Sequence, residues 1–431
     1  MRAAAARSGT WRQQGSRGGE SLALDRMDSE VRTEPARVPQ PPASSPSEAA
    51  AWLARNAVDS LPEGALEQKL AAGRPLRVKL GIDPTAPDIH LGFTVVLQKL
   101  REFQDLGHVV VLIVGDYTAR VGDPSGRSET RPVLSPAEID ANAQTFRRQA
   151  LKVLDSERLE VRFNGEWLDM TMADLFRLAR TTTVAQLLER DDFAKRFAGH
   201  EPISVLELLY PLLQGYDSVA VRADVELGGT DQKFNLLLGR QIQRMYGQPE
   251  QAILTMPLLV GTDGERKMSK SVGNYIGVTE SPDDIYGKTL SIPDDALASW
   301  YEMLFGTESP PELGPRDAKR RLARLLVARF HGVEAAEAAE REFDRVHIDR
   351  KAPEEMPTVT WPADQPDVHL PALLERAFSI SRSEARRSLV QGGVKLDGET
   401  VGNGSLDLPV IAVDGKVLQL GKRRFARVHV E

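Results

Sequence analysis

Residues 76–93 have the sequence LRVKLGIDPTAPDIHLGF and combine a strand, a tight turn and the start of a helix. The run 76–82 is typical of a strand, and the turn at 83–88 contains two prolines and two acidic residues. His90 and Gly92 then open an apolar helix. Free N–H groups and the helix dipole favour an anion at such a helix start, and Gly92 lets a ligand approach the backbone. The stretch therefore predicts an α/β fold with an anion site after this strand.

A second strand is predicted at 109–114, where the continuous apolar run VVVLIV is followed by a glycine. Helical patterns at 93–106 and 136–154 lie on either side of it. Strand, helix, strand and helix in this order indicate a parallel α/β sheet. Ligands bind such sheets at the carboxyl ends of the strands. We therefore expect the first turn, the loop after Val114 and the segment GGTDQ at 228–232 to share one edge.

The segment KMSKS at 267–271 is a second signature, in a polar loop flanked by glycine and serine. Two lysines three positions apart can close over a triphosphate and neutralise the charge that develops on it. A loop of this kind is on its own more often a solvated surface, and a histidine at a helix start is more often a cap. Together, and in this order, the two signatures indicate activation of a substrate by ATP.

Length and composition restrict the class of protein. The 431 residues exceed one ordinary core and indicate two or three domains. Lysine and arginine number 55 against 62 aspartates and glutamates, so nucleic-acid contacts must come from local basic patches. The chain has no cysteine, which excludes disulfides, thiolate zinc sites and a thiol nucleophile and is consistent with a cytoplasmic location. No stretch approaches the roughly 20 apolar residues of a membrane span, so we expect no membrane partner.

The first segment of the chain differs from the rest in composition. Residues 1–45 are rich in arginine, alanine, glycine, serine and proline and are predicted to form a disordered N-terminal extension. An organellar transit peptide and an upstream start, with Met27 as the true initiator, are the alternatives. The predicted segments that follow are an α/β domain at 46–280, a helical domain at 281–352, a proline-rich linker at 353–366 and a C-terminal module at 367–431.

A helix predicted at 206–219 carries polar residues at positions i, i+4 and i+7, namely Tyr210, Gln214 and Asp217. An amphipathic helix with this face in water is the simpler interpretation. Leucines around the rest of the helix indicate burial instead, and buried polar groups need partners. We therefore expect this face to bind a ligand. Another helix is predicted to begin near Thr230, whose hydroxyl suits an N-cap.

The C-terminal module concentrates positive charge in an acidic chain. Arg382, Arg386 and Arg387 lie in a predicted short helix, and Lys395 lies in the turn that follows. A charge run is more often a solvated face, but local basic density also fits contacts to RNA phosphates. These four residues are therefore RNA-binding candidates.

These blocks, in this order, resemble the bacterial tyrosyl-tRNA synthetases, a family of class I aminoacyl-tRNA synthetases. The similarity extends from about residue 48 to the C-terminus, and its motifs are DPTAPDIHLG at 83–92, GDPSGR at 122–127, YPLLQGYD at 210–217, GGTDQ at 228–232 and KMSKS at 267–271. The resemblance implies a Rossmann-like parallel-sheet catalytic domain, followed by an α-helical domain on the anticodon side and a small α+β RNA-binding module. It also implies a homodimer that activates tyrosine with ATP to tyrosyl-adenylate and pyrophosphate. The same enzyme would transfer tyrosine to the 3′ end of tRNA(Tyr).

The resemblance also implies a role for each matching residue. The residues expected to stabilise the transition state of adenylate formation are Thr85, His90, Lys267 and Lys270. Those expected to bind ATP are Asp83, Gly92, Arg127, Arg131, Gly229, Asp231, Met256, Lys267, Met268, Lys270 and Ser271. Those expected to hold tyrosine are Asp123, Tyr210, Gln214, Asp217 and Gln232, with Asp217 accepting the phenol proton. Mg²⁺ is expected to accompany ATP, held by phosphates and water rather than by protein ligands.

Two positions depart from the family pattern. Phe93 stands where a second histidine is typical, and phenylalanine cannot donate a hydrogen bond to the nucleotide. We therefore expect Phe93 to pack against the ribose or adenine, with a weaker affinity for ATP. Lys79 stands where some tyrosyl enzymes have a tyrosine that touches the phenol, and the sequence assigns it no role.

Other classes of protein fit the sequence less well. A tryptophanyl synthetase shares the catalytic fold but not the polar face at 210–217 or the C-terminal module. Another nucleotidyltransferase with a His-x-Gly motif lacks the distal lysine loop, and a non-catalytic RNA-binding paralogue is favoured mainly by Phe93. A dinucleotide-binding dehydrogenase is excluded because the glycine-rich strand–helix fingerprint is missing.

Overall fold

The computed structural model describes residues 45–84, 88–123, 135–348, 356–401, 406–421 and 424–431. The chain divides into two compact units, Met1–Ala336 and Glu337–Glu431, and each is described by itself. Within the described ranges, no helix is both long enough and apolar enough to cross a bilayer.

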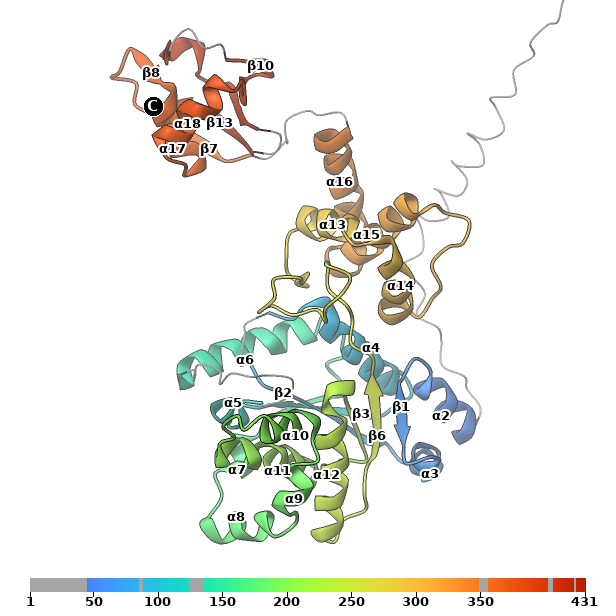
Figure 1. Ribbon diagram of the computed structural model, residues 1–431. Helices are drawn as coiled ribbons and strands as arrows, with labels where there is room; N and C mark the ends of the chain where they lie inside the picture. Colours follow the sequence, from blue (N-terminus) through green and yellow to red (C-terminus); the bar gives the residue numbers. More distant parts are fainter. Residues whose placement is uncertain (1–44, 85–87, 124–134, 349–355, 402–405, 422–423) are drawn as a thin grey trace, which may run out of the picture. The chain divides into compact units, whose positions relative to one another are not determined.

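A six-stranded sheet forms the centre of the first unit (Figure 1), with the strand order β1-β6-β5-β2-β3-β4. The strands are β1 Asp59–Leu61, β2 Arg77–Ile82, β3 Val109–Val114, β4 Leu159–Phe163, β5 Val225–Gly229 and β6 Ala252–Met256. β1 pairs antiparallel with β6, whereas all the other neighbours in this sheet pair parallel. β3 is almost wholly buried, as a strand with both faces covered must be. The predicted parallel α/β sheet is confirmed.

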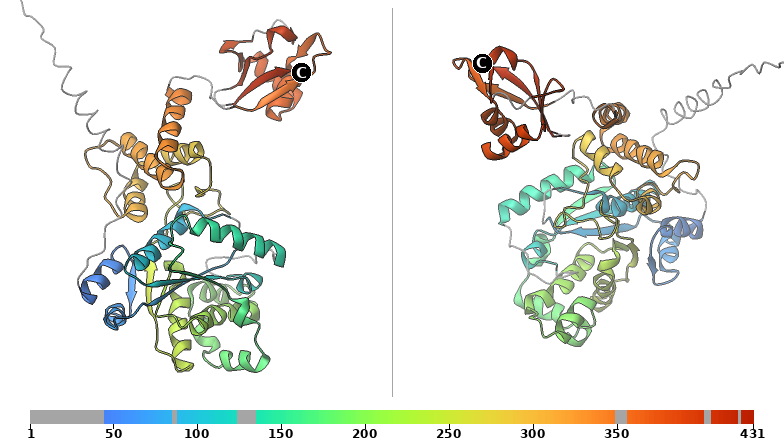
Figure 2. Two further views of the ribbon diagram at one scale, coloured as in Figure 1. Left: turned by 180° about the vertical axis from the view of Figure 1, so that it is seen from behind. Right: turned by 45° about the horizontal axis from the view of Figure 1, so that its top comes forward.

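Helices cover both faces of this sheet (Figures 1 and 2). α4 Leu91–Asp105 and α6 Pro136–Ala150 lie on one face, and α11 Val205–Ala220 and α12 Lys233–Met245 lie on the other. The remaining helices of this part are α2 Pro46–Ala54, α3 Ala65–Ala71, α5 Thr118–Val121, α7 Gly165–Leu168, α8 Met172–Ala179, α9 Val184–Leu187 and α10 Asp191–Ala198. α11 and α12 pack closely at two glycines. A Cβ on Gly215 would lie only 3.3 Å from the Cα of Gly239.

The predicted N-cap at Thr230 was wrong. Thr230–Gln232 form a 3-10 turn, η1, whose N-cap is Gly229 without a side-chain hydrogen bond, and α12 begins at Lys233. The chain is crowded at this point, since a Cβ on Gly229 would lie 2.7 Å from Asp231 Oδ1 and 2.8 Å from Leu258 Cδ2. The segment therefore makes a tight turn at the sheet edge before the helix starts.

The end of the first unit is helical. Its elements are α13 Pro282–Leu290, η2 Asp294–Ala296, α14 Leu297–Phe305, α15 Pro315–His331 and the beginning of α16 Val333–Phe343, which is followed by the π-helical turn Asp344–Ile348. Tyr286, Trp300 and Tyr301 are fully buried between these helices. The Arg329 guanidinium donates to the carbonyl of Leu304 at 2.9 Å and to Gln98 Oε1 at 2.6 Å. Arg329 thus ties α15 both to α14 and to α4 of the sheet domain.

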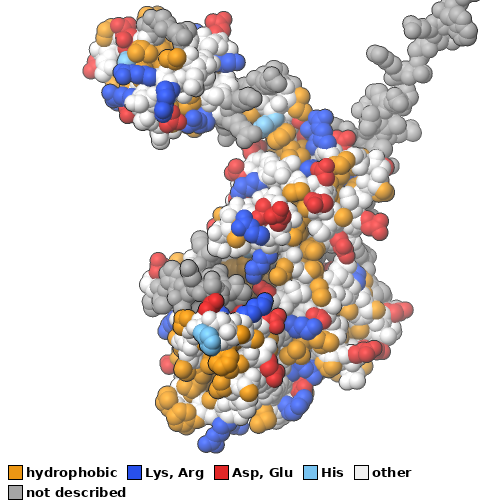
Figure 3. Space-filling view, in the orientation of Figure 1, with side chains coloured by type: hydrophobic (Ala, Val, Ile, Leu, Met, Phe, Trp, Pro, Cys, Tyr) orange, Lys and Arg blue, Asp and Glu red, His pale blue; other side chains and the backbone are white. Residues whose placement is uncertain are grey.

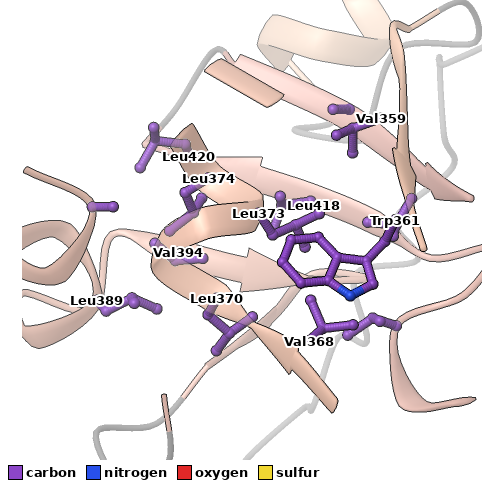
Figure 4. Packing of buried hydrophobic residues seen from close by; sticks show 14 of the residues in the cluster. Val359, Trp361, Val368, Leu370, Leu373, Leu374, Leu389, Val394, Leu418 and Leu420 are labelled. Atoms are coloured by element: carbon purple, nitrogen blue, oxygen red, sulfur yellow. The ribbon is translucent and has the colours of Figure 1, made fainter. Parts of the chain in front are cut away.

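The second unit combines a five-stranded sheet, ordered β10-β9-β12-β13-β7, with a two-stranded sheet of β8 and β11. Its elements are β7 Thr358–Trp361, β8 Asp367–His369, α17 Leu370–Phe378, α18 Arg382–Val390, β9 Val394–Leu396, β10 Glu399–Thr400, β11 Asp407–Pro409, η4 Val410–Ala412, β12 Val417–Leu420 and β13 Arg424–Val430. Figure 4 shows its core, in which Trp361 lies among Val368, Leu370, Leu373 and Leu418. The predicted small α+β module is confirmed.

β7 corrects one detail of the sequence interpretation. Its residues Thr358–Trp361 lie in the stretch 353–366 that was predicted as a linker, yet they pair in parallel with β13. Val359 and Trp361 point inward and are buried, while Thr358 and Thr360 are exposed. The nearby prolines concealed this short alternation, which is typical of a strand with one buried face.

Replacement of Leu374 by alanine tests whether the C-terminal core is one cooperative unit. The Leu374 side chain is fully buried, so its truncation should destabilise the module by about 2–5 kcal/mol. Hydrogen–deuterium exchange should then increase across the strands of the second unit and stay unchanged in β2 and β3. Val390→Ala is the matched control, because the Val390 side chain is 68% exposed. Equal exchange in the two variants would contradict a shared core.

Candidate active site

Asp83 lies directly after β2, at the carboxyl edge of the sheet. Its Oδ1 accepts a hydrogen bond from Thr118 Oγ1 at 2.6 Å, and its Oδ2 accepts one from the Tyr210 hydroxyl at 2.9 Å. Burial and Asp83 raise the pKa of Tyr210 well above its ordinary value, so the phenol of Tyr210 remains a donor. A Cβ on Gly115 would overlap both Asp83 Oδ1 and Thr118 Oγ1. The glycine after β3 is therefore required for this junction.

His90 is the N-cap of α4. Its Nδ1 accepts a hydrogen bond from the Gly92 N–H at 3.2 Å, so the neutral ring carries its proton on Nε2. Burial, followed by the positive charges of Lys270 and Lys267, lowers the pKa of His90 to about 4. At neutral pH the imidazole is therefore uncharged and has one N–H to donate.

Phe93 packs on the other residues of this helix start. Its ring centroid lies 4.7 Å from that of His90 and 6.0 Å from that of Phe146, which it meets edge to face. Phe93 therefore contacts the imidazole of His90 and α6. Its expected contact with ribose or adenine remains a prediction.

The KMSKS loop lies beside the helix start, although the two are far apart in sequence. The Leu91 N–H donates to the carbonyl of Ile276, and the Val278 N–H donates to that of Ile89, each at 2.9 Å. A Cβ on Gly92 would lie 3.0 Å from two atoms of the His90 ring and 3.6 Å from Met268 Cβ. The two sequence signatures thus lie side by side in the structure.

The two lysines of this loop are paired to different degrees. Lys267 Nζ lies 3.0 Å from Asp231 Oδ2. Lys270 Nζ is buried and lies 4.0 Å from Asp88 Oδ2, and among the described residues it has no hydrogen-bond partner. Burial lowers the pKa of Lys270, against the opposing effect of Asp88. A buried and weakly paired ammonium group is well suited to bind a phosphate oxygen.

Asn274 holds the KMSKS loop and was missed by sequence reasoning. Its Oδ1 accepts from the Ser269 N–H at 2.8 Å, and its Nδ2 donates to Asp263 Oδ2 at 3.0 Å and to the carbonyl of Lys267 at 3.2 Å. The side chain is buried, and a Cβ on Gly261 would overlap it. Asn274 therefore fixes the backbone of the KMSKS loop. No spacing in the sequence indicated this role.

A polar network joins most of the residues expected to hold tyrosine. Gln232 Nε2 donates to Asp123 Oδ2 at 3.1 Å, and Asn235 Nδ2 donates to Gln214 Oε1 at 2.8 Å and to Gln232 Oε1 at 3.1 Å. Arg190, which is buried, lies 3.8 Å from Asp123 Oδ1 and donates to Asn235 Oδ1 at 3.2 Å. Asn235 and Arg190 were not foreseen from the sequence. Asn235 lies 21 residues from Gln214, and Arg190 lies 45 residues from Asn235.

Asp217 is buried and held by two further residues that the sequence did not indicate. The Trp167 Nε1–H donates to Asp217 Oδ1 at 2.8 Å, and Asn164 Nδ2 lies 3.5 Å from Oδ2. Asn164 also donates to Thr118 Oγ1 at 3.0 Å. Burial raises the pKa of Asp217 to about 7, against the opposing effect of Lys79 and of these hydrogen bonds. Both residues follow β4, a strand that was absent from the prediction. The expectation that site residues follow the carboxyl ends of predicted strands therefore did not include them.

The other expected site residues divide into three groups. Met256 ends β6 and Met268 lies in the loop, both buried, while Ser271 Oγ lies 2.9 Å from Ser269 Oγ. Arg382, Arg386 and Arg387 are exposed on α18 and Lys395 is half-buried on β9, all in the second unit. Thr85, Arg127 and Arg131 lie outside the described residues.

Comparison with known proteins places this site in a family. The family model described as tRNA synthetases class I (W and Y) matches residues 71–347. The tyrosine–tRNA ligase of Moorella thermoacetica is 54% identical over 396 residues, which cover 88% of this chain and 94% of that protein. The tyrosine–tRNA ligase of Geobacter metallireducens is 50% identical over 401 residues, which cover 89% of this chain and 99% of that protein.

Solved structures show the same fold at lower identity. A C-terminally truncated mitochondrial tyrosyl-tRNA synthetase from Aspergillus nidulans superposes with a TM-score of 0.58 at 20% identity, covering 74% of this chain and 99% of that one. The tyrosyl-tRNA synthetase from Archaeoglobus fulgidus, complexed with L-tyrosine, gives a TM-score of 0.56 at 24% identity, covering 69% and 99%. By its sequence, and with a fold in agreement, the chain belongs to the class I tRNA synthetases of the tryptophan and tyrosine group.

Proposed function

We propose that the chain is a tyrosine–tRNA ligase, which activates tyrosine with ATP and then transfers it to the 3′ end of tRNA(Tyr). The observation that carries the proposal is the buried carboxylate of Asp217, held by Trp167 and Asn164 on a helix that also carries Tyr210 and Gln214. A buried carboxylate with acceptor capacity to spare favours an amino acid with a hydroxyl group over phenylalanine or tryptophan. Relatives of 50–54% identity, which are tyrosine–tRNA ligases, support it.

The proposed tyrosine site assigns contacts to the ammonium, the carboxylate and the phenol of the substrate. Asp123 binds the ammonium group together with Tyr210 and Gln214, and Gln232 binds the carboxylate. Asp217 accepts the hydrogen bond from the phenol. The hydrogen bonds among Asp123, Gln232 and Gln214 through Asn235 support this set, since they hold the groups in one place before substrate arrives.

Catalysis in this proposal relies on positioning and charge stabilisation. The tyrosine carboxylate attacks the α-phosphorus of ATP, the bond from that phosphorus to the bridging oxygen breaks, and pyrophosphate leaves with the electron pair. His90 donates its Nε2–H to the transferring phosphoryl group, and Lys267 and Lys270 neutralise the charge on pyrophosphate. Thr85 is assigned to the γ-phosphate.

The proposed nucleotide site lies between the start of α4 and the KMSKS loop. Its expected members are Asp83, Gly92, Arg127, Arg131, Gly229, Asp231, Met256, Lys267, Met268, Lys270 and Ser271. Asp231 accepts from the ribose after Lys267 has moved away from it. Mg²⁺ would enter with ATP, held on phosphate oxygens and water. When bound, Mg²⁺ neutralises phosphate charge.

The proposed tRNA contacts lie in the second unit. The exposed Arg382, Arg386 and Arg387 on α18, with Lys395 on β9, would contact the phosphate backbone. We place the enzyme in the cytoplasm, where tRNA and ATP are available to it. The proposed domain boundaries are those predicted from the sequence, apart from β7.

The proposed homodimer is supported by apolar side chains exposed on neighbouring helices of the first unit. They are Met172 and Phe176 on α8, Phe197 on α10, and Val205 and Leu206 on α11. α8 packs on α11, and the ion pair between Arg196 and Glu207 joins α10 to α11. Figure 3 shows hydrophobic side chains gathered over this lower end of the unit. Such a surface is typical of an interface between subunits.

Exchange of labelled pyrophosphate into ATP tests the proposed activity directly. Tyrosine should support exchange, and tryptophan and phenylalanine should not. Asp217→Asn should lower kcat/KM for tyrosine by about 10- to 100-fold, because a hydrogen bond to a charged group is lost. Glu63→Gln, a change at an exposed residue in the loop after β1, is the control and should leave exchange unchanged. Exchange with none of the amino acids would favour a non-catalytic RNA-binding relative.

Replacement of Phe93 by histidine tests the effect of the departure from the family pattern. A second imidazole can donate to the nucleotide, so KM for ATP should fall by about 2- to 10-fold. Phe93→Leu keeps an apolar side chain without a donor and should not lower KM. An ATP affinity unchanged by Phe93→His would refute the idea that Phe93 weakens nucleotide binding.

Replacement of Val205 by aspartate tests the proposed dimer. The Val205 side chain is 75% exposed, so the charge should disrupt an interface while leaving the fold of the subunit intact. Sedimentation velocity should give twice the chain mass of 47.5 kDa for the wild type and the single-chain mass for the variant. Ile411→Asp, at an even more exposed position in the second unit, should remain dimeric. A monomeric wild type would contradict the proposal.

A further inference from the structure

Lys79 is a fully buried lysine in the middle of β2. Its Nζ lies 2.8 Å from Glu226 Oε1, 2.9 Å from Ser218 Oγ and 3.0 Å from the backbone carbonyl of Gln214. An ammonium group has three N–H donors, and these three acceptors use all of them. Lys79 therefore has no donor left for a substrate hydroxyl.

Two of these acceptors belong to the turn of α11 that presents the tyrosine contacts. Gln214 and Ser218 are one helical turn apart, and Asp217 lies between them. Lys79 thus anchors this turn to the sheet from behind, while the side chains of Gln214 and Asp217 lie in the polar networks described above. A shift of this turn would move both substrate contacts together.

Glu226 completes the anchor from the neighbouring strand. Lys79 and Glu226 are directly opposite each other in the parallel pairing of β2 with β5. Glu226 Oε2 accepts from Ser218 Oγ at 3.0 Å and from Gln251 Nε2. α12 leaves space for the cluster at Gly239, where a Cβ would lie 3.3 Å from both Glu226 Oε2 and Ser218 Oγ. The sheet and both helices are therefore built around this ion pair.

We propose that Lys79 is a positioning residue for tyrosine selection, which fixes the Gln214–Ser218 turn of α11 and supplies the positive charge that keeps Asp217 ready to accept the phenol hydroxyl. This inference rests on the proposed function. A buried ion pair is by itself weak evidence for a stabilising role, because the cost of desolvation offsets the attraction. The Lys79–Glu226 pair has a function because it anchors the turn of α11 that carries Gln214 and Asp217.

The charges around Asp217 define the direction of the effect. Lys79 lowers the pKa of Asp217, the hydrogen bonds from Trp167 and Asn164 lower it further, and Glu226 raises it. The effect of Lys79 exceeds that of Glu226. Removal of both charges should therefore raise the pKa of Asp217, whereas removal of the Glu226 charge alone should lower it.

The test compares Lys79→Met/Glu226→Gln with Glu226→Gln in the full-length protein. The measurement is kcat/KM for tyrosine in pyrophosphate exchange between pH 5.5 and 9, together with KM for tyrosine and for ATP. The wild type should lose activity below a pH of about 7, where Asp217 is protonated in the free enzyme. In the double variant this loss of activity at low pH, the acid limb of the pH profile, should move to higher pH by about one pH unit. KM for tyrosine should rise about tenfold, and KM for ATP should stay unchanged.

Glu226→Gln alone should move the acid limb to lower pH. These opposite shifts distinguish an electrostatic role from general damage to the fold, and the single variant gives the answer if the double variant does not fold. Lys99→Met/Glu102→Gln is the matched control, because this pair is also buried, at 2.7 Å, but lies on α4. It should leave the acid limb for tyrosine and KM for tyrosine unchanged.

The outcomes separate this inference from the proposed function. Wild-type protein without tyrosine-dependent exchange would refute the proposed function itself. Wild-type exchange, with the same acid limb and KM for tyrosine in both Lys79 and Glu226 variants, would leave the function intact and overturn the role of Lys79.

Discussion

Asp83 accepts hydrogen bonds from Thr118 and Tyr210 directly after β2 ends, and so joins β2, α5 and α11 at one sheet edge. Thr118 in turn accepts from Asn164, whose side chain reaches Asp217. One chain of hydrogen bonds thus extends from the first strand of the sequence signature to the residue proposed to recognise the phenol. This series of hydrogen bonds forms only because parallel strands place their carboxyl ends along the same edge of the sheet.

The two ends of the site differ in how their charges are satisfied. Asp217 is held by Trp167 and Asn164, which fixes the geometry of its carboxylate before a substrate binds. At the KMSKS loop, the buried Nζ of Lys270 lies 4.0 Å from Asp88 Oδ2, and Lys267 pairs with Asp231, which is proposed to bind the ribose. The first arrangement favours selection of one amino acid, and the second favours the exchange of protein contacts for phosphate contacts.

Much of the fold and part of the site could be predicted from local patterns. The run at 109–114, the helix start at His90 and the spacing of Tyr210, Gln214 and Asp217 each express a local periodicity, and the structure contains them as predicted. Asn164, Trp167, Arg190, Asn235 and Asn274 could not be predicted in this way. Each is a single side chain whose contacts follow no regular spacing, and a lone asparagine or tryptophan carries no periodic signal. β7 was missed for a related reason, since four residues between prolines are too few to show a period.

The sequence by itself determined the alternation of the first buried strands with helices, the motifs at their ends and the family to which the chain belongs, because these depend on residues close together along the chain. Only the tertiary structure decided what Lys79 does. The sequence shows a lysine in an apolar strand, and burial of its charge is tolerable only if acceptors from other elements surround it. Glu226 on the neighbouring strand and the turn of α11 supply those acceptors, and their meeting with Lys79 depends on strand pairing and helix packing rather than on any local pattern.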